Sequence, residues 1–488
     1  MTSSTASSAP SVSPTTEQKL PLPSLTAMVV GSMVGAGIFN LPGRFATATG
    51  PFGALIAWAI AGTGMYMLAR VFQALAEKRP DIDNGVFAYA KAGFGDYVGF
   101  LSAFGYWIGS VLGNVFYWVL IGTTLGRFFP QIFGDGTSVI AIIVSLVGVW
   151  AFHFMILRGV KEATYVNTIV TIAKIVPLIL AVLLFVFFFN YSHFSENFFG
   201  GVGMPEKSLI AQVRDTMLIT VFVFIGIEGA SVYSRYATKR LDVGAATVLG
   251  FVGVTGLMVA ITLLPYAVAP RAAISEVANP SLAGALELAV GHWGAVLISI
   301  GVLVSVLGAF LAWTLICAEV LFAAGKSQDM PRLFAAQNSN KVPAIALWLS
   351  NIIVSLFIIS TYWSRDAFNL MLNMTSVTAL LPYLLVAAYG VLLARSGVGY
   401  ETAPNERGRD QIFAWIAVVY TIFMFIAAGL KYVLLMTVLL APGTILYFWA
   451  RWEQKARLFT QVELGIFAVT LIAAAIGVYG LATGLITP

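Results

Sequence analysis

Charged residues are scarce in this sequence: Asp, Glu, Lys and Arg make up only 10% of the 488 residues, whereas 59% are hydrophobic. A water-soluble chain of this size needs far more polar surface, so the composition indicates an integral membrane protein. Histidine and cysteine are scarcer still, with three histidines and a single cysteine, Cys317. One cysteine cannot form a disulfide within the chain, and the histidines lack any ligand spacing, so we expect no metal site.

Motifs of other membrane protein classes are also missing. The sequence has no selectivity-filter repeat of an ion channel and no nucleophile–base constellation of an enzyme, so we expect neither function and no cofactor. Residues 1–23 are rich in Ser, Thr and Pro and lack the charged and apolar regions of a signal peptide. They predict a disordered cytoplasmic tail.

Long apolar runs fill the rest of the chain. A spanning helix needs roughly 20 apolar residues, and about thirteen stretches satisfy this. They lie at 24–49, 52–76, 96–129, 137–157, 163–190, 209–235, 242–268, 291–325, 343–361, 366–395, 411–429, 431–451 and 463–485. The sequence therefore predicts an all-α integral membrane protein with about 12–13 transmembrane helices.

The placement of Lys and Arg predicts the orientation. With a cytoplasmic N-terminus and alternating sides, most of these residues fall in cytoplasmic loops, as the positive-inside rule requires. An odd number of spans would leave the C-terminus outside. The net charge of +5 reflects these loops and gives no sign of nucleic-acid binding.

Two apolar stretches contain glycines near their middle. The first reads GSMVGAGIFNLPG, from Gly31 to Gly43, and the sixth reads FVFIGIEGAS, from Phe222 to Ser231. Glycines in one span are consistent with close helix packing. Glycine-interrupted first and sixth spans are also what a five-plus-five inverted repeat produces, with broken helices that offer backbone groups to a substrate at the membrane midplane. The carboxylate and ammonium of an α-amino acid suit the two kinds of helix end.

Several motifs together resemble a known family. GSMVGAGIFNLP, NGVFAYAKAGFGDYVGF, GYWIGSVLGN, AKIVPL, FIGIEGAS, KRLDVGAAT and AWTLICAE occur in an order and spacing similar to the amino acid–polyamine–organocation superfamily. Within it the chain looks most like the basic amino acid/polyamine antiporters, particularly bacterial arginine/ornithine antiporters. The resemblance covers essentially everything after the tail. It implies a LeuT-type fold with inverted repeats at 24–190 and 209–395 and peripheral spans at 411–485.

The resemblance also implies a function. We expect exchange of extracellular L-arginine for cytoplasmic L-ornithine by alternating access, in the plasma (inner) membrane of a bacterium. Lysine is a further candidate substrate. Alternatives are lysine/cadaverine or arginine/agmatine exchange, and uptake by a proton-coupled permease. Monomer and homodimer both stay open.

Residues for a cationic substrate follow from the matched motifs. Trp313 falls on a substrate-stacking tryptophan, although most tryptophans in membrane proteins pack or lie at interfaces; an indole face over a cation contributes about 0.5–2 kcal/mol. Phe222 falls on a second aromatic contact, and Met33 and Ile225 fall on apolar contacts. Other implied substrate contacts are Ala36, Gly37, Ser110, Asn114 and Thr375.

Some of these residues carry alternatives or departures from the family. Ala36 stands where arginine/agmatine relatives carry serine, so only its backbone is expected to meet the substrate carboxylate. Tyr106, Ser110 and Asn114 recur every four residues and share one helix face. They are either a polar seam between packed helices or part of the binding site.

Four residues are expected to gate or couple transport. Glu228 is a carboxylate beside the sixth-span break, and it is a candidate gate that responds to protons or substrate. Tyr106 resembles a tyrosine tied to this glutamate, and Tyr383 resembles a gating tyrosine. Lys174 resembles a lysine whose ammonium replaces a sodium ion beneath the first-span break. A lysine that extends to the membrane surface is the alternative for Lys174.

Overall fold

The computed structural model describes residues 22–82, 86–159, 163–201, 204, 207–228, 240–364, 366–401 and 403–486. Within these ranges the regular secondary structure is helical and contains no strand, which confirms the all-α prediction. Residues 1–21 of the predicted tail and residues 229–239 lie outside the described ranges. Nine described helices are long and apolar enough to cross a bilayer, or ten if a bent pair counts as one span.

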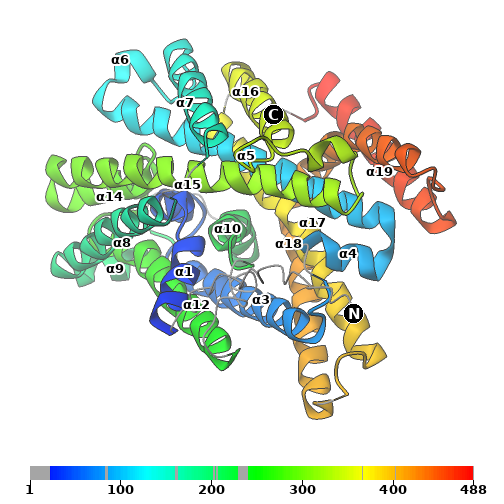
Figure 1. Ribbon diagram of the computed structural model, residues 1–488. Coiled ribbons are helices and arrows are strands. Elements are labelled where there is room, and N and C mark those ends of the chain that lie inside the picture. The colour runs from blue at the N-terminus through cyan, green and yellow to red at the C-terminus, as the bar shows by residue number, and fades with distance from the viewer. Residues whose placement is uncertain are drawn as a thin grey trace, which may run out of the picture.

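The helices follow the predicted apolar stretches (Figure 1). The first half of the chain contains α1 Leu22–Met33, η1 Ala36–Asn40, α2 Leu41–Ala48, α3 Pro51–Lys78, α4 Val86–Phe94, α5 Asp96–Phe128, α6 Pro130–Phe133, α7 Val139–Leu157, α8 Ala163–Phe187, α9 Tyr191–Asn197 and α10 Leu209–Phe224. The second half contains α12 Arg240–Leu263, η3 Leu264–Ala267, α13 Arg271–Ser275, α14 Ser281–Val290, α15 His292–Lys326, η4 Arg332–Ala335, α16 Ala344–Ser360, η5 Thr361–Trp363, α17 Ala367–Ser396, α18 Pro404–Glu453 and α19 Gln461–Ala482.

The first span is broken where the sequence places its glycines. α1 ends at Met33, and Gly35 is extended, with φ −100° and ψ −171°. A 3₁₀ turn follows, and α2 then begins with Pro42 in its first turn. Proline is well suited to this position because the first helical N–H groups have no intrahelical acceptor. The span therefore consists of two half-helices joined by an irregular segment.

α18 contains two spans that fold back on each other. A continuous helix of its length would extend about 75 Å, far beyond the roughly 30 Å hydrocarbon core. Gly429 interrupts it with φ 81° and ψ 161°, values that favour glycine. Near its start Glu406 accepts from Lys78, and near its end Arg451 pairs with Asp96. Both ends of α18 therefore lie at the α3–α5 connection, and the separate stretches at 411–429 and 431–451 are confirmed.

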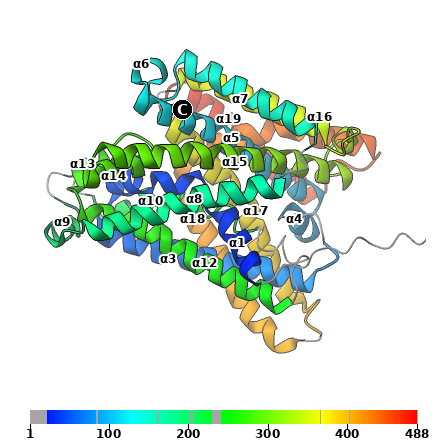
Figure 2. The ribbon, with the colours of Figure 1, turned by 60° about the vertical axis from the view of Figure 1, so that its left-hand side comes forward.

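Polar contacts divide the connecting loops between two ends of the bundle. The connections that follow α3, α15, α17 and the second half of α18 meet at one end, through pairs such as Lys91–Asp329 and Lys78–Glu406. At the opposite end Arg127 of α5 pairs with Glu287 of α14, and Arg271 donates to the Ala46 carbonyl of α2. Figure 2 shows α4 at the first end and α9, α13 and α14 at the second. The two sets of contacts mark the two ends of the bundle.

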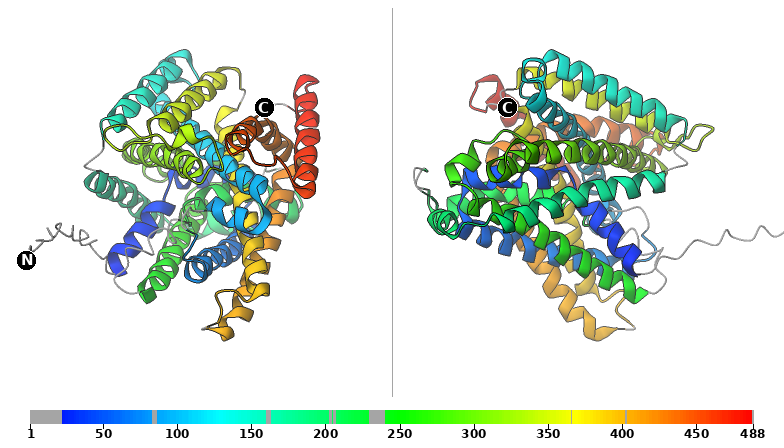
Figure 3. Two further views of the ribbon diagram at one scale, coloured as in Figure 1. Left: turned by 45° about the vertical axis from the view of Figure 1, so that its right-hand side comes forward. Right: turned by 90° about the vertical axis from the view of Figure 1, so that its left-hand side faces the viewer.

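The most enclosed helix is α5, in which 89% of the most apolar window is buried. By contrast α19 lies at the edge of the bundle, as the left view of Figure 3 shows, and only 22% of its window is buried. Its exposed side chains are apolar, including Val462 and Ile472. Such a surface suits lipid, where apolar side chains need no protein partner.

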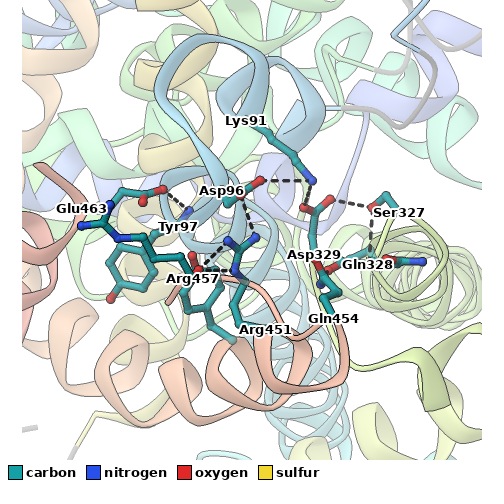
Figure 4. A network of polar contacts seen from close by, with 12 residues as sticks. Lys91, Asp96, Tyr97, Ser327, Gln328, Asp329, Arg451, Gln454, Arg457 and Glu463 are labelled. Carbon is teal, nitrogen blue, oxygen red and sulfur yellow. Dashed lines mark hydrogen bonds and ion pairs between the residues drawn. The ribbon is translucent and has the colours of Figure 1, made fainter. Parts of the chain in front are cut away.

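A charged network joins the α4–α5 connection to the end of α15 and to the C-terminal helices (Figure 4). Lys91 pairs with Asp329 and lies 3.4 Å from Asp96, and Asp96 accepts from Arg451 at 2.7 Å. Burial alone lowers the pKa of Lys91, but the two carboxylates outweigh burial and hold that pKa above its usual value. Glu463 of α19 accepts from the Tyr97 backbone N–H at 2.8 Å.

Candidate functional site

Two interrupted helices meet at a cavity inside the bundle. α1 ends at Met33 and α10 ends at Phe224. Figure 1 shows α10 near the centre of the bundle, between α1, α3 and α17. The space there that no atom fills, including the solvent-open part, is about 540 Å³. Its lining residues are Met33, Gly35, Ala36, Gly37, Tyr106, Gly109, Ser110, Gly113, Tyr117, Phe222, Val223, Ile225, Trp313, Thr375 and Ala379.

The cavity brings together most of the residues predicted to meet substrate. Trp313 reaches it from α15, Phe222 and Ile225 from the end of α10, and Thr375 from α17. The lining also contains Met33, Ala36, Gly37, Ser110 and the predicted gate residue Tyr106. Segments separated by more than 300 residues in sequence thus share one wall.

The lining is aromatic and weakly polar. None of the described residues that form it carries a charged side chain. The Ser110 hydroxyl donates to the Tyr106 carbonyl and the Thr375 hydroxyl to the Met371 carbonyl, each at 2.8 Å. Because the hydroxyl protons are used within their own helices, the two oxygens remain as acceptors. Acceptors and aromatic faces together suit a cationic donor group.

Asn114 is the one predicted substrate contact that does not line the cavity. It is buried on α5, one turn beyond Ser110, and its Nδ2 donates to the Cys317 sulfur at 3.5 Å. Its neighbours Gly113 and Tyr117 line the cavity but Asn114 does not, so its role in substrate contact stays a prediction.

Glu228 is held by donors from three segments. The Tyr106 hydroxyl donates to Oε1 at 2.7 Å, and the Tyr383 hydroxyl donates to Oε2 at 2.8 Å. The backbone N–H of Gly226 donates to Oε2 at 3.0 Å, and Gly226 has φ 106°, which favours glycine. The carboxylate thereby connects the end of α10 to α5 and α17. Tyr106 also lines the cavity, so a single side chain contacts both the cavity and Glu228.

Lys174 contacts the broken first span. Its ammonium donates to the Gly31 carbonyl at 3.2 Å. Gly31 lies in the last turn of α1, where carbonyl groups have no intrahelical donor and the helix end is partially negative. The lysine is buried, so it does not extend to the surface. The contact joins α8 to the end of the first half-helix, and the role of the ammonium in place of a sodium ion stays a prediction.

Sequence reasoning missed several lining residues on α5. Gly109, Gly113 and Tyr117 face the cavity beside Tyr106 and Ser110. The signal was present, because 106, 110, 113 and 117 follow the three- and four-residue spacing of one helix face. A wall built from small residues and one aromatic was not distinguishable from ordinary packing in the sequence.

Comparisons with known proteins place this architecture in a family. The amino acid permease family model matches residues 20–450. The chain is 49% identical to the arginine/ornithine antiporter of Pseudomonas aeruginosa, over 96% of this chain and 98% of that protein. It is 39% identical to the L-lysine transport protein of Corynebacterium glutamicum, over 96% of each chain. It is 37% identical to the arginine/agmatine antiporter of Chlamydia pneumoniae, over 92% of this chain and 95% of that protein.

Proposed function

This chain belongs to the amino acid permease family, and from that premise we propose that it exchanges extracellular L-arginine for cytoplasmic L-ornithine by alternating access. The observation that carries the proposal is the full-length similarity to the Pseudomonas arginine/ornithine antiporter. The aromatic cavity at the helix breaks supports it, because both substrates present a cationic end to Trp313 and an aliphatic stem to Met33 and Ile225.

We further propose that residues 24–190 and 209–395 are two inverted repeats and that 411–485 are peripheral. The interrupted first span and the end of α10 at Phe224 support this division, because each lies at the start of one repeat. The positive-inside rule supports a cytoplasmic location for the end that holds Lys91 and Arg451, and with it the N-terminus. The membrane would be the bacterial plasma membrane.

Charge balance distinguishes this exchange from its rivals. Arginine and ornithine each carry one net positive charge, so one-for-one exchange moves no net charge. Arginine/agmatine or lysine/cadaverine exchange moves one charge per cycle, which couples to the membrane potential by about 2.3 kcal/mol per 100 mV. Proton-coupled uptake of a single amino acid would need no internal substrate at all.

Purified protein in liposomes loaded with ornithine tests the proposal. External labelled arginine should accumulate only when ornithine is inside, and an imposed potassium diffusion potential should leave the initial rate unchanged. Empty liposomes are the control. Uptake without internal substrate would contradict exchange, and a rate that follows the potential would favour the diamine-exporting alternatives.

Trp313→Leu should weaken arginine binding about tenfold. Leucine keeps apolar bulk on the cavity wall but removes the indole face that would stack on the guanidinium. Competition of unlabelled arginine against labelled ornithine measures the change in apparent affinity. Trp363→Leu, which replaces a tryptophan that is 73% exposed in η5, is the matched control. Equal affinities of the unmodified and Trp313→Leu proteins would exclude the stacking role.

Exchange should not require sodium, because the Lys174 ammonium already donates a hydrogen bond to the Gly31 carbonyl. Rates in sodium and in choline buffers of equal ionic strength should agree. Lys174→Ala should reduce turnover by more than it reduces the yield of folded protein, since the orphan carbonyl is then buried without a donor. A steep sodium dependence of the unmodified protein would remove the basis of this assignment.

A further inference from the structure

Arg44 is a charged residue inside the broken first span that the proposed exchange does not use. It lies on α2, and its guanidinium donates to Asn369 Oδ1 at 2.7 Å and to Asn373 Oδ1 at 3.3 Å. Both asparagines belong to α17. The residue is only partly exposed, although it sits among membrane-spanning helices.

The partners of Arg44 are neutral. Among the described residues no carboxylate lies within ion-pair distance of its guanidinium, which two amide oxygens hold instead. The carboxylate of Asp366 is occupied by the Asn369 backbone and side-chain N–H groups, at 3.1 and 2.6 Å. Asn373 in turn donates to the Tyr432 hydroxyl at 2.8 Å. Asp366 and Asp215 act on the guanidinium electrostatically, but its direct partners are neutral amides, so no ion pair among the described residues neutralises its charge.

The position of Arg44 places that charge on the outer side of the cavity. Arg44 follows Gly37 of the lining by seven residues, roughly 10 Å along the span. On α17 its partners Asn369 and Asn373 precede Thr375 of the lining. The same half-helix ends beside Arg271, at the end of the bundle opposite Lys91. Arg44 therefore lies between the cavity and that end of the bundle.

The described lining of the cavity contains no charged side chain. Charged side chains lie around it instead: Glu228, which Tyr106 connects to the lining, Lys174 at the end of α1, and Arg44 on α2. Beyond the partial charges of the helix ends, selection by net charge therefore has to come from these flanking residues.

We propose that Arg44 is a specificity-determining residue that favours substrates with an α-carboxylate over diamines, an inference that rests on the proposed exchange of basic amino acids. Arginine, ornithine and lysine each carry one net positive charge and a carboxylate. Agmatine, cadaverine and putrescine carry two positive charges and none. Repulsion from a fixed cation scales with the charge of the substrate, whereas a carboxylate is attracted to it. Arg44 thus rejects the decarboxylated relatives of its own substrates.

Competition in proteoliposomes tests this proposal. Uptake of labelled arginine into ornithine-loaded liposomes is inhibited with external ornithine or external cadaverine, and the ratio of the two inhibition constants is the readout. In Arg44→Gln the preference for ornithine over cadaverine should fall about tenfold, as loss of one unit charge at this range predicts. Arg44→Lys should keep the preference. Arg127→Gln, which removes an arginine at the same end from its pair with Glu287, should also keep it.

Three results would overturn the proposal: an unchanged ratio in Arg44→Gln, an equal loss in Arg44→Lys, or an equal loss in Arg127→Gln. If Arg44→Gln does not fold, the unmodified protein decides. Raising matched internal and external salt shortens the Debye length from about 30 Å at 0.01 M to about 3 Å at 1 M. Cadaverine should then compete better relative to ornithine, and a ratio that ignores salt would exclude the electrostatic role. Absence of arginine exchange in the unmodified protein would instead contradict the proposed function.

Discussion

Gly37→Ala should reduce arginine exchange by roughly a hundredfold. A Cβ atom at Gly37 would lie 2.6 Å from Phe222 Cδ1 and 2.8 Å from Val223 Cγ1, closer than real contacts allow. The Phe222 ring cannot withdraw freely, because its centroid is 4.8 Å from that of Phe116, which packs on Phe368 at 4.9 Å. Overpacking of this kind costs about 1–3 kcal/mol and separates the two helix ends that form the cavity.

Initial rates of exchange in proteoliposomes measure this effect, with folded yield checked by size exclusion. Gly256→Ala is the matched control, because a Cβ there on α12 meets no atom within 4 Å. It makes the same chemical change in a membrane helix and should exchange normally. A Gly37→Ala protein as active as the control would show that the helix ends can separate without loss of the site.

Glu228→Gln should reduce exchange by roughly ten- to hundredfold. The carboxylate accepts from Tyr106, Tyr383 and the Gly226 N–H through both of its oxygens. An amide offers one acceptor oxygen and no charge, so on its other side the NH₂ group replaces the charged acceptor and a tyrosine hydroxyl has to accept from it instead of donating. A hydrogen bond to a charged group contributes about 1.5–3 kcal/mol, which sets the size of the loss.

A double-mutant cycle with Tyr106→Phe isolates the contact. Tyr106→Phe should slow exchange in the unmodified protein but add little to Glu228→Gln, because the hydrogen bond is already lost. Additive effects would return Glu228 to a structural role.

The spans and the first break were predictable because their signals are local. Gly35 weakens a helix interior, Pro42 suits a helix start, and a run of 20 apolar residues needs no partner to be recognised. The boundary between the stretches 411–429 and 431–451 falls at Gly429, whose φ of 81° favours glycine. Glu228 was recognisable as a carboxylate inside an apolar stretch, whereas Trp313 and Phe222 were reached only through their match to family motifs.

What the sequence could not reveal are contacts between distant segments. Nothing near Arg44 indicates that Asn369 and Asn373, more than 300 positions later, hold its guanidinium. Which residues of a helix face line the cavity could not be predicted either. Asn114 shares a helix face with Ser110, yet it donates to Cys317 and does not line the cavity. Helical spacing gives the direction of a side chain but not the depth of the space in front of it.

The charged network at the start of α5 has a consequence for biosynthesis. Asp96 and Arg451 are 355 positions apart, and Glu463, which accepts from Tyr97, follows later still. At about 5–20 residues per second, a ribosome needs roughly 20–70 s to reach Arg451 after it has made Asp96. Throughout that interval Asp96 lacks its arginine, and the substrate-binding helices emerge before the helices that brace them. The start of α5 therefore lacks its contacts with Arg451 and Glu463 until these C-terminal residues have been synthesised.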